Sequence, residues 1–141
     1  MTKKEWYKDR ILWKANQFKL VLETRLKGEE RDNFLDKLHK EYMDSDDEIL
    51  FLFSENNKTN WTAITTDKVI SYHNNSVYQL KLDSIEKLIE IKKDGISDNN
   101  LKHDANFLLI GYEKLPIWTP NAKTLFALMN VLRMFPLKKN I

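Results

Sequence analysis

The chain of 141 residues has no cysteine and only three glycines and three prolines. The absence of cysteine excludes disulfides, thiolate zinc sites and cysteine nucleophiles, and it is typical of a reducing compartment. Three scattered glycines exclude a glycine-rich phosphate loop. No run approaches the roughly 18 apolar residues of a membrane span, and the charged N-terminus lacks a signal-peptide core. We therefore expect a cytoplasmic protein.

Charge of either sign is not concentrated anywhere along the chain. The 23 basic and 21 acidic side chains are interspersed and leave a net charge of +2. A nucleic-acid-binding protein needs basic residues gathered on one face or stripe. The sequence therefore predicts a solvated surface and no specific nucleic-acid partner.

Residues 1–45 show helical periodicity and predict an N-terminal helical hairpin packed on the rest of the chain. Gly28 suits the left-handed position that follows a helix, because glycine has no Cβ to clash there. Two apolar faces carry the prediction: Tyr7, Ile11, Phe18 and Leu22 on the first helix, and Phe34, Leu35, Leu38 and Tyr42 on the second.

After residue 48 the periodicity becomes that of strands. Asn74 and Asn75 predict a tight turn between two of them, because asparagine tolerates a positive φ. In the flanking strands we expect Ile70 and Tyr72 to point inward and Ser71 and His73 to face solvent. Seven strands are predicted, at 49–53, 61–65, 69–73, 77–82, 88–92, 106–113 and 115–118.

Two of these segments, ILFLF at 49–53 and NFLLIGY at 106–112, are apolar on both faces. Such strands must be covered on both sides. The helical hairpin is the economical cover, and a dimer interface is the alternative. After the last strand, Thr119 and Pro120 predict the start of an amphipathic helix that runs toward Phe135.

The stretch AITTDKVISYHNNSVYQLKLDSIEKL, residues 63–88, resembles the centre of bacterial pleckstrin-homology-like domains, relatives of the GRAM group. The matching elements are Ile64–Ile70 and Leu82–Ile85, and the resemblance extends over about 46–136. It implies an α+β fold for 46–141, a PH-like antiparallel seven-stranded barrel capped by a C-terminal helix. It also implies protein, peptide or lipid contact, often oligomerisation, and no catalytic residue set.

The residues that could carry chemistry are not arranged for it. His39, His73 and His103 lack metal-binding spacing, and no serine sits in a nucleophile elbow. The acidic run at 44–48 lacks the glycine of a calcium loop and is better interpreted as a polar linker. We therefore expect no catalytic residue, cofactor or metal site.

The candidate binding residues are Lys58, Trp61 and His73 near adjoining loops, and Lys8 with Trp13 on the first helix. The first strand connection has only one lysine and also carries Glu55. Specific inositol-phosphate binding needs several cationic donors and is not expected there. For Trp61 the alternative is a place in the barrel core.

These observations predict a non-catalytic interaction module that binds a protein or peptide partner or self-associates as a homo-oligomer. One alternative is a peripheral membrane-binding protein that uses the basic, amphipathic first helix for weak surface association. Another is a small enzyme with a pocket at a barrel end, where His73 or His103 would meet a carboxylate.

Overall fold

The computed structural model describes residues 2–20, 26–55, 57–93, 95–100 and 104–137. Helices and strands follow one another in the order expected from the sequence, and the fold is α+β. The α-helices are α1 (Lys3–Gln17), α2 (Gly28–Tyr42) and α4 (Ala122–Leu132). The strands are β1 (Ile49–Ser54), β2 (Trp61–Thr65), β3 (Lys68–His73), β4 (Ser76–Lys81), β5 (Ile89–Ile91), β6 (Phe107–Ile110) and β7 (Leu115–Trp118). Short 3-10 turns occupy Leu82–Ser84 and Asp98–Asn100.

The strands form two antiparallel sheets. Sheet A has the order β1-β2-β3-β4 and sheet B the order β5-β6-β7, so within each sheet the paired strands are consecutive in the chain. Among the described residues, no backbone ladder joins the two sheets. The expectation of a barrel closed by strand pairing is therefore wrong.

The two sheets meet instead along a line of side-chain hydrogen bonds, which we call the seam. The Trp118 amide of β7 donates to Ser71 Oγ at 2.9 Å, and the Thr62 hydroxyl donates to the Trp118 carbonyl at 2.6 Å. The Thr62 and Ser71 hydroxyls lie 2.7 Å apart, and His73 Nε2 lies 3.2 Å from the Pro116 carbonyl. These side chains satisfy the outer edge of β7, which would otherwise carry unpaired backbone groups.

The seam corrects our interpretation of the alternation in β3. Ser71 and His73 do not face solvent, since they are 0% and 4% exposed. Ser71 lies opposite Tyr78 in the ladder, and Ile70 lies opposite Gln79. Directly paired residues share a face of a sheet, so Ser71 faces sheet B together with Tyr78 while Ile70 faces outward. Alternation with a period of two distinguishes the two faces of a strand, but it does not show which face is exposed to solvent.

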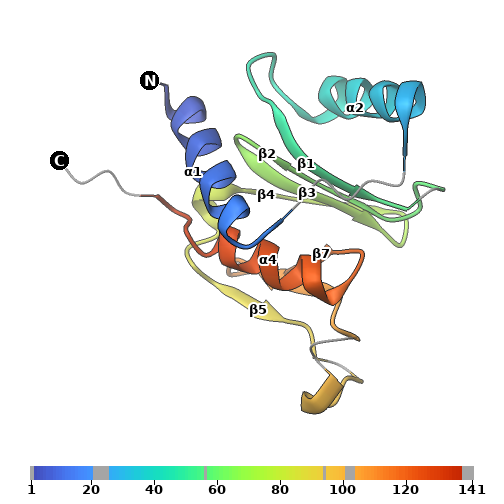
Figure 1. Ribbon diagram of the computed structural model, residues 1–141, viewed down its shortest axis with the longest axis vertical. Coiled ribbons are helices and arrows are strands. Elements are labelled where there is room, and N and C mark those ends of the chain that lie inside the picture. The colour runs from blue at the N-terminus through green and yellow to red at the C-terminus, as the bar shows by residue number, and fades with distance from the viewer. Residues whose placement is uncertain (1, 21–25, 56, 94, 101–103, 138–141) are drawn as a thin grey trace.

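Helices α4 and α1 complete the main core. The apolar face of α4 packs with the inner faces of both sheets, and Tyr7, Ile11 and Ala15 place α1 in the same cluster. Figure 1 shows α1 beside α4 at one side of the molecule. The Tyr7 ring meets Phe135 edge-on, with centroids 5.0 Å apart. The core therefore lies between the two sheets, and helices α1 and α4 cover it.

Helix α2 lies on the opposite, outer face of sheet A (Figure 1). Phe34 and Leu38 pack there against Trp61, Leu52 and Ile70 in a second, smaller cluster. Because α1 and α2 contribute to clusters on different faces of sheet A, the expectation of a helical hairpin is wrong. The two-sided apolar character of β1 has the predicted cause, however: one face meets the core and the other meets α2.

The end of α1 also differs from the prediction. The helix ends at Gln17, and Lys19 takes the left-handed conformation with φ 55°. The amides of Lys19 and Leu20 bond back to the carbonyls of Asn16 and Ala15, which is a Schellman motif. Gly28 instead begins α2. A lysine, and not the expected glycine, therefore takes the left-handed position after α1, and the residue that follows it, Leu20, is buried.

The acidic linker at 44–48 ties α1 to sheet A. Lys4 Nζ lies 2.7 Å from Asp46 and 2.6 Å from the buried Asp47, and Lys8 Nζ lies 2.9 Å from Glu48. The Asp47 carboxylate also accepts the Asp44 amide at 3.0 Å. The linker thus anchors the first two turns of α1.

The start of the last helix is one further correction. Asn121 caps α4 and accepts the Thr124 amide at 2.8 Å. The Thr119 hydroxyl, which we expected to be the cap, donates to the Asn106 carbonyl at 2.9 Å.

Candidate functional site

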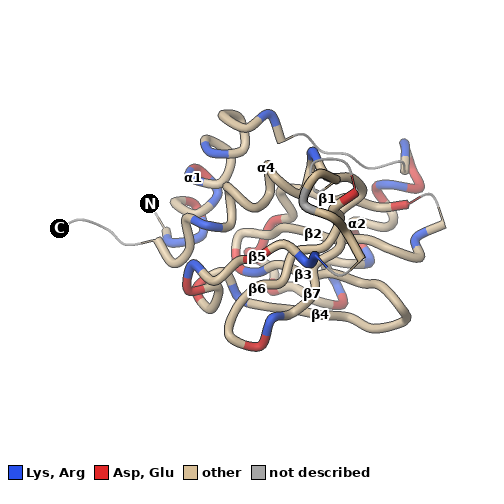
Figure 2. The backbone as a smooth tube through the Cα atoms, turned by 90° about the horizontal axis from the view of Figure 1, so that it is seen from below, with Lys and Arg blue, Asp and Glu red and all other residues tan. Residues whose placement is uncertain are grey.

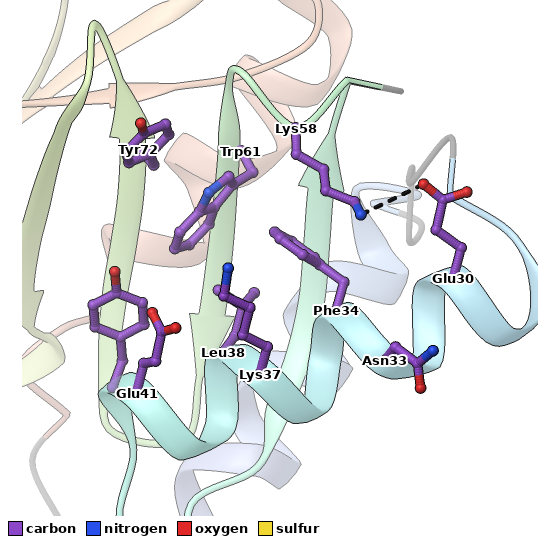
Figure 3. Close-up of a pocket in the computed structure, with 10 residues that line it drawn as sticks. Glu30, Asn33, Phe34, Lys37, Leu38, Glu41, Lys58, Trp61 and Tyr72 are labelled. Atoms are coloured by element: carbon purple, nitrogen blue, oxygen red, sulfur yellow. Dashed lines mark ion pairs between the residues drawn. The ribbon is translucent and has the colours of Figure 1, made fainter.

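An open groove of about 450 Å³ runs between α2 and the outer face of sheet A. It crosses the ends of β2 and β3 and reaches the β1–β2 connection, as Figure 3 shows. We call it the α2 groove. Its lining residues are Glu30, Asn33, Phe34, Lys37, Leu38, Glu41 and Tyr42 of α2, together with Lys58, Trp61 and Tyr72.

The floor of the groove is aromatic. Trp61 and Tyr72 are direct partners in the β2–β3 ladder, and their rings lie parallel with centroids 5.9 Å apart. Phe34 meets Trp61 edge-on at 5.8 Å, and Tyr42 lies tilted at 6.0 Å. Such contacts add to the stabilisation from burial and hold the rings in fixed positions. The indole of Trp61 is 5% exposed, whereas Tyr72 is half-buried and offers more of its ring to a ligand.

One end of the groove is closed by a lysine and a glutamate. Lys58 Nζ lies 3.5 Å from Glu30 Oε1 and 5.4 Å from the centre of the Phe34 ring. Figure 3 shows this pair reaching from the β1–β2 connection to the first turn of α2. Both side chains are substantially exposed, so the ion pair contributes little stability and can be exchanged for contacts with a ligand.

The β1–β2 connection is internally braced, which fixes the position of Lys58. The Glu55 carboxylate accepts from the Thr59 hydroxyl at 2.8 Å and from the Asn60 side chain at 3.1 Å. The Lys58 amide donates to the Glu55 carbonyl at 3.0 Å, and Lys58 has a φ of 58°. Glu55 is therefore a structural residue of this connection.

The rim of the groove carries charges of both signs. Glu30 and Glu41 balance Lys37 and Lys58, so the four charged lining residues sum to zero. Burial, with a smaller contribution from the carboxylate of Glu41, raises the pKa of the Tyr42 hydroxyl. That hydroxyl stays protonated at neutral pH and is hydrogen-bonded to the Glu41 carboxylate. A groove with this rim favours a ligand of low net charge over a polyanion.

The structure brings two of the five predicted binding residues together. Lys58 and Trp61 both line the α2 groove. His73 does not join them, because its buried ring lies on the other face of sheet A, stacked on Tyr78 and edge-on to Phe107. The prediction placed His73 near the loops and on the solvent-facing side of β3, whereas this side of the strand faces sheet B and His73 is buried.

The two predicted residues of α1 have separate surroundings. Lys8 pairs with Glu48, whereas Trp13 is 47% exposed and lies under Arg10, whose Cζ is 4.2 Å from the ring centre. Neither residue belongs to the α2 groove.

Sequence reasoning missed the contribution of α2 to the groove. Phe34 and Tyr42 were recognised as one face of a helix, but that face was assigned to a helical hairpin. Tyr72 was assigned to the interior. The signal that could have found the groove is the β2–β3 pairing, which places Trp61 beside Tyr72 on a face that needs a cover.

The described part of the chain contains no group of three or more side chains suited to hold a metal ion. Each described histidine has one ring nitrogen near a backbone carbonyl: His39 Nε2 lies 3.0 Å from that of Asp47, and His73 bonds at the seam. His103 lies outside the described residues. Within the described residues, no helix has the length and apolar character needed to cross a bilayer.

The chemistry offered by the α2 groove is therefore that of recognition, with a fixed aromatic floor and a balanced charged rim. Comparison of the chain with protein-family models, with curated proteins and with solved structures finds no match.

Proposed function

We propose that the chain is a pleckstrin-homology-like interaction module that binds a peptide segment of a protein partner in the α2 groove. Four antiparallel strands, three more and then a helix follow one another in the chain, which supports this fold assignment. The resemblance of residues 63–88 supports it from the sequence. Helix α2 lies outside the proposed PH-like unit and supplies one wall of the groove.

The observation that carries the proposal is the aromatic floor beside a neutral rim. Aromatic residues are enriched at the centres of protein interfaces, where they anchor a partner's side chains. A partner side chain that buries ~100 Å² of apolar surface on Tyr72 would gain about 2.5 kcal/mol before ordering costs. Glu30, Lys37 and Lys58 then supply polar contacts that select the partner's charge pattern.

We infer a non-catalytic, cytoplasmic role. Support comes from the two described histidines, each of which has a ring nitrogen within hydrogen-bond distance of a backbone carbonyl rather than a carboxylate. A general base or nucleophile–base pair needs a side-chain partner at such a position. A second copy of the chain is an alternative occupant of the groove and would produce a homo-oligomer.

The test is a selection of phage-displayed random 12-residue peptides against the full chain, followed by calorimetry of the enriched peptides. We expect peptides with an apolar or aromatic anchor. Binding should weaken at least tenfold in Tyr72→Ala, which removes the more exposed part of the floor, and more mildly in Lys58→Gln. Chemical-shift changes on peptide addition should map to α2, β2 and β3.

The matched control is Tyr112→Ala, since Tyr112 is 80% exposed and lies outside the α2 groove. This variant should bind the selected peptides like the unmodified chain. Enriched peptides that bind Tyr72→Ala with full affinity would contradict the assignment of the groove. Light scattering that shows a dimer dissociated by Tyr72→Ala would replace the peptide with a second copy.

A further inference from the structure

A second surface, on the outer side of α1, combines exposed rings with cations. We call it the α1 patch, and it consists of Arg10, Leu12, Trp13, Lys14, Phe18 and Lys19. Figure 2 shows basic positions along the coil of α1 at the outside of the molecule. The α2 groove lies on the far face of sheet A, so the two surfaces are separate.

Most of α1 is already committed to the fold. Its apolar face is buried in the core through Tyr7, Ile11 and Ala15. The basic residues of its first half are paired: Lys4 with Asp46 and Asp47 and Lys8 with Glu48, as described above, and Lys3 with Asp83. The whole helix therefore cannot lie on a membrane in the way its amphipathic sequence predicts. Only the exposed side of the second half of α1 is left to contact a partner.

The α1 patch contains three large apolar side chains that are each at least 40% exposed. Leu12, Trp13 and Phe18 are 40%, 47% and 40% exposed. Cations lie over the rings: Arg10 Cζ is 4.2 Å from the centre of Trp13, and Lys14 Nζ is 5.8 Å from Trp13 and 5.4 Å from Phe18. The rings and the cations thus reach the same side of the helix.

The charge of the patch is of one sign. Residues 10–20 contain three basic side chains and no acidic one. Within the described residues, none of these three cations forms an ion pair. Asp9, one turn before Trp13, is the acid that precedes the patch in the chain. The contrast with the neutral rim of the α2 groove indicates a different kind of partner.

We propose that the α1 patch binds the surface of a membrane that contains anionic lipids. Tryptophan and phenylalanine rings settle at the level of the lipid headgroups, and the surrounding cations meet the phosphates. The exposed area of three apolar side chains is far smaller than the roughly 800 Å² of surface that each partner contributes to a stable protein interface. Binding to a membrane does not require an apolar area of that size, because the lipid surface is continuous and each patch side chain can contact lipid.

The binding is shallow and salt-sensitive. The apolar face of α1 stays in the core, so only the patch side chains enter the headgroup region. Each cation near an anionic surface strengthens partition about fivefold. Removing two of them should therefore weaken partition roughly 25-fold. Since the Debye length falls from about 10 Å at 0.1 M salt to 3 Å at 1 M, high salt should release the protein.

The experiment is co-sedimentation of the full chain with vesicles of phosphatidylcholine alone or with 40% phosphatidylserine. We expect binding to the anionic vesicles at low salt, release at 1 M salt and little binding to the neutral ones. Arg10→Gln with Lys14→Gln, and separately Trp13→Ser, should each weaken binding. All of these positions are at least partly exposed, so thermal melts should be unchanged.

The matched control is Lys40→Gln with Lys123→Gln, which removes the same charge from exposed positions on α2 and α4. It should retain most of the binding. An equal loss in the control would show attraction by net charge alone and overturn the assignment to α1. Absence of sedimentation with anionic vesicles at low salt would overturn the proposal as a whole, and it would leave peptide binding in the α2 groove unaffected.

Discussion

Removing one hydroxyl from the seam should measurably destabilise the protein. Thr62→Val keeps the shape of the side chain but deletes the donor to the Trp118 carbonyl, which lies 2.6 Å away in a buried position. Ser71→Ala deletes the acceptor of the Trp118 amide at 2.9 Å. Each substitution leaves a buried backbone group without its partner, at a cost of about 1–3 kcal/mol. A loss of 2 kcal/mol lowers Tm by roughly 6–10 °C in a chain of this size.

The assay is urea unfolding followed by far-ultraviolet circular dichroism. We expect a lower midpoint with an unchanged slope, because the seam variants should not alter the surface exposed on unfolding. The double variant should deviate from the sum of the single ones by at least about 0.5 kcal/mol, since the Thr62 and Ser71 hydroxyls are also partners of each other. Ser76→Ala, at an exposed position of β4, is the control and should change stability by less than about 0.5 kcal/mol. If both seam variants match this control, the seam does not join the sheets as we argue.

Two further predictions follow from the geometry. Gly111 has φ +78°, and a Cβ placed there would lie 3.0 Å from Cδ2 of Leu80 in β4. At Gly95, with φ +75°, an added Cβ would have no atom within 4 Å. Gly111→Ala should therefore cost about 1–3 kcal/mol in urea unfolding and more than Gly95→Ala, and equal costs would refute the contact. Burial opposes ionisation of Asp83, but hydrogen bonds from Lys3 and Tyr7 lower its pKa overall. Because the folded pKa lies below the unfolded value of about 3.9, this carboxylate stabilises the fold above that pH and its contribution is lost as the pH falls through the folded pKa. Tm measured from pH 6 to pH 2 should fall less steeply in Asp83→Asn, and an unchanged slope would contradict the assignment.

The strands were predictable because their signals are local. All seven occur near their predicted positions, although β6 ends at Ile110 where the prediction continued to residue 113. Asn74 and Asn75 both take the positive φ expected of a tight turn, at 51° and 60°. The arrangement of strands into two sheets was not predictable, because alternation describes the faces of a strand and not what its edges meet. Ser71 and His73 have the polarity of solvent-facing residues, yet they serve the edge of β7.

The helices show the same limit. The apolar faces of α1 and α2 were recognised, but an amphipathic face states only that a helix is covered and not by what. Phe34 packs on Trp61, 27 positions further along the chain, and this contact decides that α2 lies on sheet A. The α2 groove is a product of that packing, so only its two members from β2 and the preceding turn, Trp61 and Lys58, were found from the sequence.

The seam differs from a strand ladder in what it demands of the residues that form it. A ladder uses backbone atoms that nearly every amino acid supplies, and it therefore survives most substitutions. The hydrogen-bonded joint between the sheets requires side chains at positions 62, 71 and 73 that can donate or accept a hydrogen bond. It also occupies the outward backbone groups of Trp118, so β7 has little left to offer an incoming strand from another molecule. Three side chains thus supplement the shared core in joining the two sheets, and they cover a strand edge that could otherwise pair with another molecule.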